Sequence, residues 1–252
     1  MNYYDTHHER LSKACDTIRT RGYWSPFQES PSRRFHPEGA RLAGQQAFEA
    51  RLGTPFDLGL DASLLASGAL ATPDEISPYT GDPLGISYPH IDVDQSMAAM
   101  AVAMRKWARA LPKERVGLCL EMLDRWHNQT FENAYATMHT AGQGFMMAFA
   151  GSGANSLDRG LEGLAIAHQA MNAIPTTAIF ERSFGRAEPA RLHKRYRLHP
   201  RGIAIVITCG SYPAWNAYPA IMANLATGNP VVVKPHPGAI LPMAIAVETG
   251  RA

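Results

Sequence analysis

Two polar loops near the end of the sequence hold the residues best suited to bind a nucleotide. Thr208, Gly210 and Ser211 follow one apolar run, and Lys234 follows a second one. At the end of a buried strand, the ammonium of Lys234 has donors for ribose hydroxyls or a phosphate and little competition from water. A surface lysine whose stem lies along apolar residues, with its charge in solvent, gives the same pattern. Both interpretations remain open at this point.

These loops belong to a predicted unit of strand, helix and strand. Residues 203–207 are apolar and rich in β-branched side chains, which is typical of a strand buried on both faces of a parallel sheet. A helical stretch follows and ends at Gly228, and residues 230–233 form the second buried strand. Because ligands bind beyond the carboxyl ends of parallel strands, we expect both loops to face one crevice. The first turn lacks the glycine fingerprint of an ordinary dinucleotide site.

The three cysteines offer little independent chemistry. Cys15, Cys119 and Cys209 are odd in number and widely spaced, unlike a zinc site or a secreted disulfide scaffold, and they favour a reducing cytoplasm. Cys209 alone lies in the predicted crevice, where a cysteine with a histidine base would suit a thioester hydrolase. No sequence feature supplies that base. We interpret Cys15 and Cys119 as structural.

A helical block precedes the strands. Asp94 is expected to cap its first helix, whose apolar residues recur at helical spacing. Pro112 suits the first turn of the next helix. Further helices are expected from near Thr130 and from about Ser156, with a glycine joint at residues 151–153. The apolar positions of the first two helices, expected in the core, are Met97, Met100, Ala101, Met104, Trp107, Ala108 and Leu111, then Val116, Cys119, Leu120, Leu123 and Trp126.

The first 75 residues alternate helical patterns with proline breakers, so their elements are expected to be short. A turn cluster at residues 77–85 separates them from the helical block. His7 and His8 are adjacent, and we interpret them as an exposed pair and predict no metal. No stretch has the length or apolarity of a secretory signal or a membrane span.

Charge and composition exclude some classes of partner. The 252 residues carry a formal net charge of +2, which is too small a bias to indicate nucleic acid or an anionic membrane. Residues 181–202 hold seven basic side chains against two acids and are interpreted as a solvated hairpin or an inter-subunit segment, with anion binding as the alternative. Tyr196 alone provides no stacking platform for a single nucleic-acid strand.

Two segments of the sequence resemble the aldehyde dehydrogenase superfamily. They read RGIAIVITCGSYP from Arg201 and LATGNPVVVKP from Leu225, and the SPYTG cluster and the helix with Trp107 and Pro112 precede them in the expected order. The resemblance therefore covers about residues 75 to 252. The turn TCGSYPAWN and the long preceding region look most like the PaaN-type proteins of phenylacetic acid degradation.

The resemblance implies an α/β fold with an incomplete doubly wound, Rossmann-like cofactor domain at residues 76–252, preceded by a helical extension at residues 1–75. It also implies attack of a cysteine thiolate on an aldehyde, transfer of hydride to NAD or NADP, and release of the product by water that a glutamate activates. Neither that cysteine nor that glutamate falls within these residues, so the chain alone is not expected to catalyse the reaction. The intact relative is expected to be a homo-oligomer acting on an aldehyde, with a coenzyme A thioester as one possibility.

Two positions depart from the family pattern. Ser211 stands where an asparagine usually stabilises the oxyanion, and Asn216 is nearby but one helical turn further on. Pro237 stands where many NAD-preferring members have a glutamate that repels a 2′-phosphate. Without that carboxylate, Lys234 and His236 favour NADP, although His236 also fits a solvated loop residue. The alternative to an enzyme fragment is a non-catalytic module for nucleotide binding or assembly.

Overall fold

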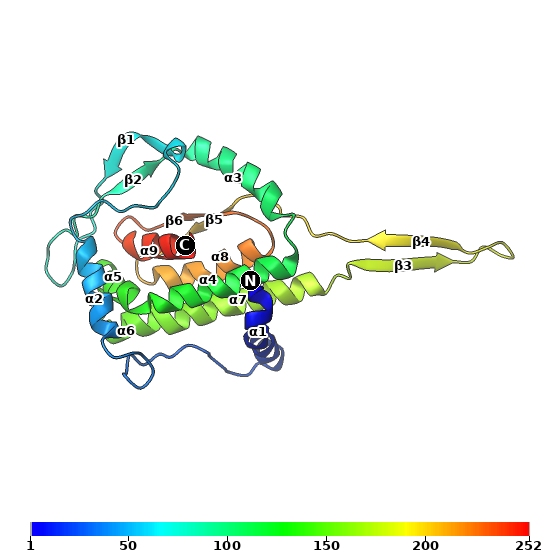
Figure 1. The fold of residues 1–252 in the computed structure, drawn as a ribbon, viewed down its shortest axis with the longest axis horizontal. Coiled ribbons are helices and arrows are strands. Elements are labelled where there is room, and N and C mark those ends of the chain that lie inside the picture. The colour runs from blue at the N-terminus through cyan, green and yellow to red at the C-terminus, as the bar shows by residue number, and fades with distance from the viewer. Residues whose placement is uncertain (1, 252) are drawn as a thin grey trace.

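The computed structural model describes residues 2–251, except for the side chains of residues 67–69. Figure 1 shows a layered helical body from which one hairpin projects. The helices are α1 (Tyr3–Thr20), α2 (Ala40–Arg51), α3 (Val93–Trp107), α4 (Pro112–Asn128), α5 (Thr130–Ala141), α6 (Phe145–Phe149), α7 (Asn155–Asn172), α8 (Pro213–Ala226) and α9 (Leu241–Arg251), with the short turns η1 (Ala62–Leu64) and η2 (Ala150–Ala154). The strands are β1 (Leu65–Ala71), β2 (Tyr88–Ile91), β3 (Thr177–Arg182), β4 (Ala190–Arg195), β5 (Ala204–Ile207) and β6 (Val231–Lys234).

The strands pair in three separate two-stranded sheets. β1 with β2 and β3 with β4 are antiparallel, whereas β5 and β6 are parallel and joined by α8. The predicted strand, helix and strand unit is therefore confirmed, including the helix stop at Gly228, whose φ of 95° is a left-handed value that favours glycine. The mixed helix and strand composition is that of an α/β protein with a helical amino-terminal region.

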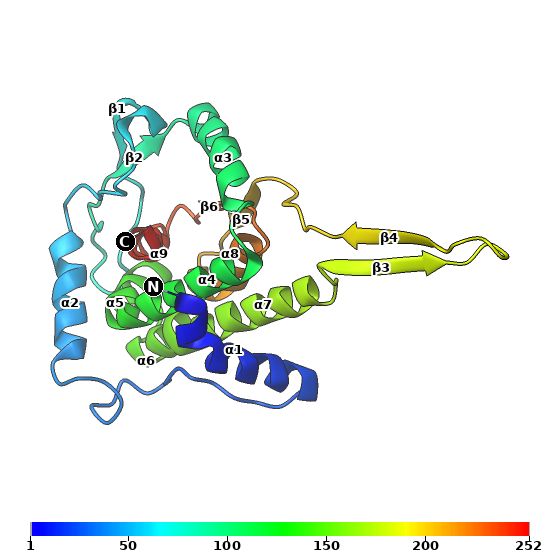
Figure 2. The ribbon, with the colours of Figure 1, turned by 45° about the vertical axis from the view of Figure 1, so that its right-hand side comes forward.

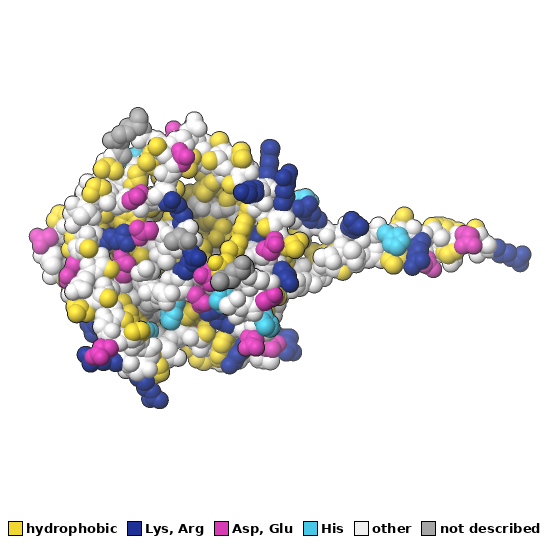
Figure 3. Space-filling model, viewed as in Figure 1, with side chains coloured by type: hydrophobic (Ala, Val, Ile, Leu, Met, Phe, Trp, Pro, Cys, Tyr) yellow, Lys and Arg dark blue, Asp and Glu magenta, His cyan; other side chains and the backbone are white. Residues whose placement is uncertain are grey.

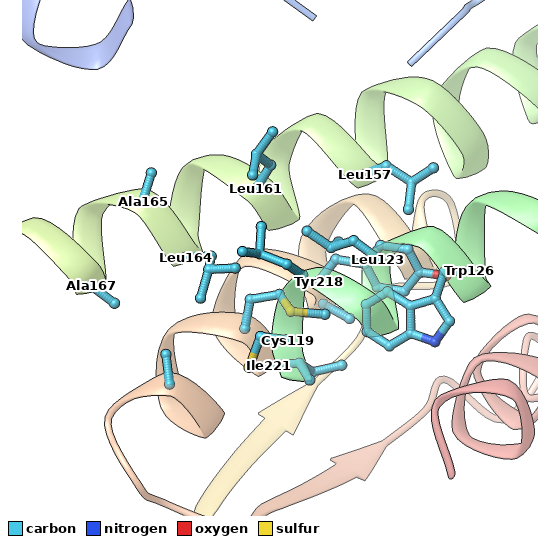
Figure 4. Close-up of a cluster of buried hydrophobic side chains, with 14 of the residues drawn as sticks. Cys119, Leu123, Trp126, Leu157, Leu161, Leu164, Ala165, Ala167, Tyr218 and Ile221 are labelled. Atoms are coloured by element: carbon cyan, nitrogen blue, oxygen red, sulfur yellow. The ribbon is translucent and has the colours of Figure 1, made fainter. Parts of the chain in front are cut away.

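The main core joins α1, α4, α7, α8 and β5. Figure 4 shows how side chains of α4, α7 and α8 meet there, with the rings of Trp126 and Tyr218 stacked at a centroid distance of 4.0 Å. Gly160 and Gly163 let α7 and α8 approach closely, because a Cβ on Gly163 would lie 2.6 Å from the carbonyl oxygen of Pro219. The predicted core stripe of α4 is confirmed, since Val116, Cys119, Leu120, Leu123 and Trp126 are all buried.

A second core packs α2, α5, α9 and residues 56–88. Arg51 of α2 links these elements, because its guanidinium donates to Glu132 of α5 at 3.0 Å and to Glu248 of α9 at 2.6 Å. Burial raises the pKa of the Glu132 carboxyl, and the Arg51 charge opposes that rise. This second core holds α9 in place, and so it also fixes the position at which the loop before α9 ends.

The structure corrects three expectations about the helices and their surroundings. α1 runs for 18 residues, so the amino-terminal elements are not uniformly short. The cap of α3 is Asp92, whose carboxylate accepts from the amide of Gln95 at 2.9 Å, and not Asp94. His7 is half-buried between α1 and α4 rather than exposed, and only His8 is solvated.

The apolar face of α3 was also predicted to be core, but α3 contains no buried residue among those described. Its Met104 and Trp107 instead line a cavity of about 680 Å³ shared with α4 and with Leu225 and Pro230 near β6. Figure 3 shows this hollow with hydrophobic side chains in it. The periodicity of α3 correctly marked a helix, but the helix faces a cavity and not a filled interior.

Residues 203–207 were expected to be buried on both faces, and this is wrong for one face. Val206 is buried, but Ile205 and Ile207 on the opposite face are 66% and 64% exposed. Helix α8 packs on the sheet of β5 and β6 on the Val206 side. A parallel sheet is normally covered on both faces, so this pair of isoleucines is a surface suited to further contacts.

The basic segment forms the β3–β4 hairpin, which extends away from the body in both ribbon views (Figure 2). Its strands pair in continuous register from Thr177 with Arg195 to Arg182 with Ala190, and nearly all their side chains are exposed. The expectation of an exposed hairpin is confirmed. No helix among residues 2–251 combines the length and hydropathy needed to cross a bilayer.

Candidate functional site

The two loops predicted to share a crevice lie side by side. β5 and β6 are in register up to Ile207 and Lys234, and the amide of Thr208 donates to the carbonyl of Lys234 at 3.1 Å. Further along, the ring of His236 packs against Gly210, where an added Cβ would meet imidazole atoms at 3.1 to 3.2 Å. The structure therefore brings Thr208, Gly210, Lys234 and His236 to one edge of the sheet.

The first loop is fixed by its own side chains and by α8. The side-chain carbonyl of Asn216 accepts from the amide of Cys209 at 3.0 Å. The sulfur of Cys209 accepts from the amide of Tyr212 at 3.3 Å and from the hydroxyl of Ser211 at 3.8 Å. Asn216 thus holds the turn by its oxygen, which leaves its NH₂ group for other partners, and Ser211 is exposed beside it.

The second loop is organised around His236. The amide of Gly238 donates to Nδ1 of His236 at 3.1 Å, and the amide of Ala239 donates to its carbonyl at 2.9 Å. An Nδ1 that accepts carries no proton, so Nε2 holds the proton of the neutral ring and is free to donate outward. Lys234, His236 and Pro237 are all exposed, while Ala239 is fully buried and anchors the loop.

The edge where the two loops meet presents hydrogen-bond donors to solvent. The hydroxyl of Thr208 is buried and has no hydrogen-bond partner among the described residues, although Thr208 is only 4% exposed. A buried hydroxyl without a protein partner usually has an ordered water molecule beside it. The ammonium of Lys234 and Nε2 of His236 belong to exposed residues and provide donors for ribose hydroxyls or phosphate oxygens.

Sequence reasoning missed Gln143 in the loop between α5 and α6. Its side-chain amide donates to the carbonyl of Ser211 and so ties the helical body to the first loop. Nearby, the ring of Tyr212 lies so close to Gly151 that an added Cβ there would be 2.9 Å from it. A single glutamine between two glycines carries no pattern that predicts this contact, which depends on the tertiary packing.

None of the three cysteines has the environment of a paired nucleophile. Burial raises the pKa of Cys119 to about 12, and burial also raises the pKa of Cys15. The hydrogen-bond partners found for the sulfur of Cys209 in the described chain are the donors of Ser211 and Tyr212, neither of which is a base. Among the described residues, Cys209 therefore has no base beside it of the kind that a thioester hydrolase needs.

One group of potential metal ligands lies away from the crevice, at the contact of α1 and α4. Nε2 of His7 is 3.2 Å from a carboxylate oxygen of Glu121, and Nδ1 is 3.4 Å from one of Asp124. Arg10 pairs with Asp124, and Arg125 pairs with Glu121 at 3.1 Å. Because both carboxylates already have cationic partners, we interpret the group as an ion-pair network that fastens α1 to α4.

Comparison with known proteins identifies the family. The sequence profile of the aldehyde dehydrogenase family matches residues 66–250. An NAD-dependent aldehyde dehydrogenase from Burkholderia multivorans has a similar structure, with a TM-score of 0.94 and 44% identity over the whole of this chain and 44% of its own. No curated protein matches the sequence.

More distant structures share the fold. Proline utilization A from Bdellovibrio bacteriovorus is 16% identical with a TM-score of 0.69, over 91% of this chain and 23% of its own. A 1-pyrroline-5-carboxylate dehydrogenase from Thermus with bound NAD is 17% identical with a TM-score of 0.64, over 90% of this chain and 43% of its own. The chain spans less than half the length of each of these three proteins.

Proposed function

Because the chain belongs to the aldehyde dehydrogenase family, we propose that its crevice binds the nicotinamide cofactor of an enzyme that oxidises an aldehyde. The observation that carries the proposal is the meeting of the two loops after β5 and β6, where Lys234 and His236 present donors at one edge. Ligands of parallel α/β sheets bind at this edge.

Each residue has a proposed part in binding. The ammonium of Lys234 binds ribose hydroxyls or a phosphate, and Thr208 holds Lys234 in place through the hydrogen bond of its amide to the Lys234 carbonyl. Because Gly210 has no side chain, the nucleotide can approach the backbone of the first loop closely. Ser211, at the position of the family's asparagine, donates a hydrogen bond to the substrate oxygen. When bound, the nicotinamide supplies the acceptor for a hydride.

The choice of cofactor is proposed from the second loop. Pro237 carries no carboxylate to repel a 2′-phosphate, and Nε2 of His236 is positioned as a donor because Nδ1 accepts from Gly238. These features favour NADP over NAD. The relatives argue in the other direction, since the Burkholderia protein is described as NAD-dependent and a Thermus relative has NAD bound.

The wider proposal concerns the substrate and the setting. Following the PaaN-type resemblance, the intact enzyme would act in a reducing cytoplasm. Its substrate would be an aldehyde from the breakdown of phenylacetate or another aromatic compound, and this aldehyde could be carried as a coenzyme A thioester. The nucleophilic cysteine and the glutamate would come from outside residues 1–252, so this chain alone is proposed to be inactive. The same proposal divides the chain into a helical extension at residues 1–75 and part of a cofactor-binding domain at residues 76–252.

Titration calorimetry tests the cofactor site. Wild-type protein is titrated with NAD and NADP, and Lys234→Ala is expected to weaken binding by about tenfold or more, the size of one lost charged hydrogen bond. Lys194→Ala, on the exposed hairpin, changes net charge equally and is the matched control. Absence of binding, or equal weakening in both variants, would contradict the proposal. Enzyme-like oxidation of an aldehyde by the purified chain would overturn the proposed inactivity.

A second candidate function is assembly, and the β3–β4 hairpin favours it. Ile179, Phe180, Phe184 and Leu192 are all large apolar side chains between 42% and 56% exposed on this projecting arm. Apolar groups clustered on a two-stranded arm fit an interface between copies of the chain. Sedimentation analysis of wild-type protein and Phe180→Ser tests this, and a monomeric wild-type protein would contradict it.

A further inference from the structure

The amino-terminal end of α9 lacks a capping side chain from its own segment. The carbonyl of Ile240 accepts the first bonds of α9, from the amides of Met243 and Ala244, both at 3.0 Å, so Ile240 is the capping position. An isoleucine side chain cannot accept a hydrogen bond. The next residues are Leu241 and Pro242, and a proline has no amide to satisfy. The amides of Ile240 and Leu241 therefore need an acceptor from elsewhere.

Glu75 supplies that acceptor across a separation of more than 160 residues. One oxygen of its carboxylate accepts from the amide of Ile240 at 2.6 Å and from the amide of Leu241 at 2.9 Å. The other oxygen accepts from the hydroxyl of Tyr88 at 2.8 Å. Both free amides of the first turn are thus satisfied by one side chain, at the end of the helix where the dipole favours a negative charge.

The carboxylate is held rigidly in this position. Glu75 is 1% exposed, Leu241 is fully buried, and Tyr88 is buried with its ring stacked on Phe56 at 5.8 Å. The carbonyl of Glu75 also accepts from the amide of Leu84, a residue of the turn cluster, at 2.8 Å. Burial raises the pKa of the Glu75 carboxyl, while its three hydrogen bonds oppose that rise. A buried carboxylate is costly unless it is fully bonded, and this one is.

The capped end of α9 is continuous with the second crevice loop. Ile240 follows Ala239, which is fully buried and donates its amide to the carbonyl of His236 at 2.9 Å. His236 in turn packs on Gly210 of the first loop. Contacts therefore run from Glu75 through the start of α9 and His236 to Gly210, and they join the turn cluster to both loops.

We propose that Glu75 is a positioning residue for the cofactor crevice, whose carboxylate fixes the start of α9 and thereby holds the loop with His236 against Gly210. The inference rests on the proposed function, because it assigns a role in the geometry of that same site. Glu75 is 1% exposed, so it acts through the loop and not by direct contact with a cofactor. Glu75 keeps the loop ordered before the cofactor binds. A loop that spends less time in the arrangement that can bind gives the protein a proportionally lower affinity for the cofactor.

The test compares two substitutions of similar size. Glu75→Gln keeps an oxygen for the two amides and an NH₂ group that donates to the hydroxyl of Tyr88, whereas Glu75→Leu leaves the amides without a partner. Amide hydrogen exchange is measured in the free chain of residues 1–252, for residues 208–212 and 234–244. We expect Glu75→Leu to accelerate exchange there by about tenfold, as two buried amides lose their acceptor, and Glu75→Gln to remain within about threefold of wild type.

The matched control is Asp92→Ala, which removes the carboxylate cap of α3; among the described contacts Asp92 has no hydrogen bond to either crevice loop. It is expected to lower stability without changing exchange at residues 208–212 or 234–244. If Glu75→Leu does not fold, Tyr88→Phe, which removes one support of the carboxylate, is expected to give a smaller local increase. Equal exchange in Glu75→Leu and wild type would overturn the inference, as would acceleration spread evenly over all helices.

Cofactor titration of the same variants separates the two proposals. If wild-type protein binds NAD or NADP, Glu75→Leu is expected to lose affinity by about fivefold or more while Glu75→Gln and Asp92→Ala retain it. If wild-type protein does not bind, the proposed cofactor site fails, and the exchange measurement still decides whether Glu75 orders the loop. Full affinity in Glu75→Leu would refute the positioning role.

Discussion

Substituting Gly163 by alanine tests the packing that places α8, and therefore the first crevice loop. The new Cβ would lie 2.6 Å from the carbonyl oxygen and 2.9 Å from Cα of Pro219. Ordinary contacts begin at 3.4 Å, so α7 and α8 must separate by several tenths of an ångström. Because the neighbouring atoms are backbone, no side-chain rotation can relieve the contact.

Two opposing effects set the size of the change. Replacing glycine by alanine inside a helix stabilises the helix by about 1 kcal/mol. Overpacking a core typically costs about 1–3 kcal/mol, and a contact with rigid backbone belongs at the upper end of that range. We expect Gly163→Ala to lower the free energy of unfolding by about 1–2 kcal/mol. The corresponding fall in Tm is about 3–6 °C for a chain of this size.

Urea unfolding followed by circular dichroism measures this change. Gly22→Ala is the control, because it lies on the surface outside a helix, its φ is not left-handed, and the atom nearest to its Cβ position is the Thr20 hydroxyl at an ordinary 3.5 Å. The control should change stability by less than about 0.5 kcal/mol. A Gly163→Ala protein as stable as wild type, or more stable, would refute the argument that α7 and α8 need glycine at their contact.

Three further predictions concern charge, thiol reactivity and exposed surface. Burial raises the pKa of Asp158 from 3.8 to about 6, so the folded protein holds the proton of this carboxyl more tightly than the unfolded chain does. The stability that comes from burying the protonated carboxyl is fully present below pH 3.8 and is lost as the pH rises through 6. In urea titrations, Asp158→Asn should therefore raise the free energy of unfolding at pH 8 by about 1 kcal/mol, after a reduction for solvent screening, and leave it unchanged near pH 3.5. The same difference at both pH values would refute this prediction. At pH 8 a thiol reagent should modify the partly exposed Cys209 in the native protein. It should modify Cys119, which is buried and has a pKa near 12, only after unfolding. Equal rates of modification for the two cysteines would contradict these environments. Ile205→Ser combined with Ile207→Ser should reduce self-association in sedimentation velocity because these side chains form an exposed apolar face; unchanged association would show that the face makes no contacts.

Local patterns predicted the parts of the fold that depend on neighbours in sequence. The β-branched run before Thr208, the helix stop at Gly228 and the second apolar run together predict β5, α8 and β6, because each element carries its own periodicity and its own end signal. Pro112 and the stripe from Val116 to Trp126 predict α4 for the same reason. The meeting of the two loops then follows from the geometry of parallel strands.

Long-range packing explains what the sequence did not predict. The face of α3 has helical periodicity, but periodicity does not reveal that a cavity lies below Met104 and Trp107. Similarly, an apolar strand predicts burial, while the exposure of Ile205 depends on which elements cover the sheet. Of the candidate site, the sequence identified Lys234 and His236 by position, but the contacts of Gln143 and Glu75 join segments far apart in the chain and leave no local pattern.

The central claim is that the loops after β5 and β6 form a nicotinamide nucleotide site. Hydrogen exchange of wild-type protein with and without saturating NAD or NADP tests it most directly, because the measurement locates the ligand as well as detecting it. The structure predicts protection at residues 208–212 and 234–240, with little change in the β3–β4 hairpin. No protection under saturating cofactor, or protection confined to the basic hairpin, would contradict the claim.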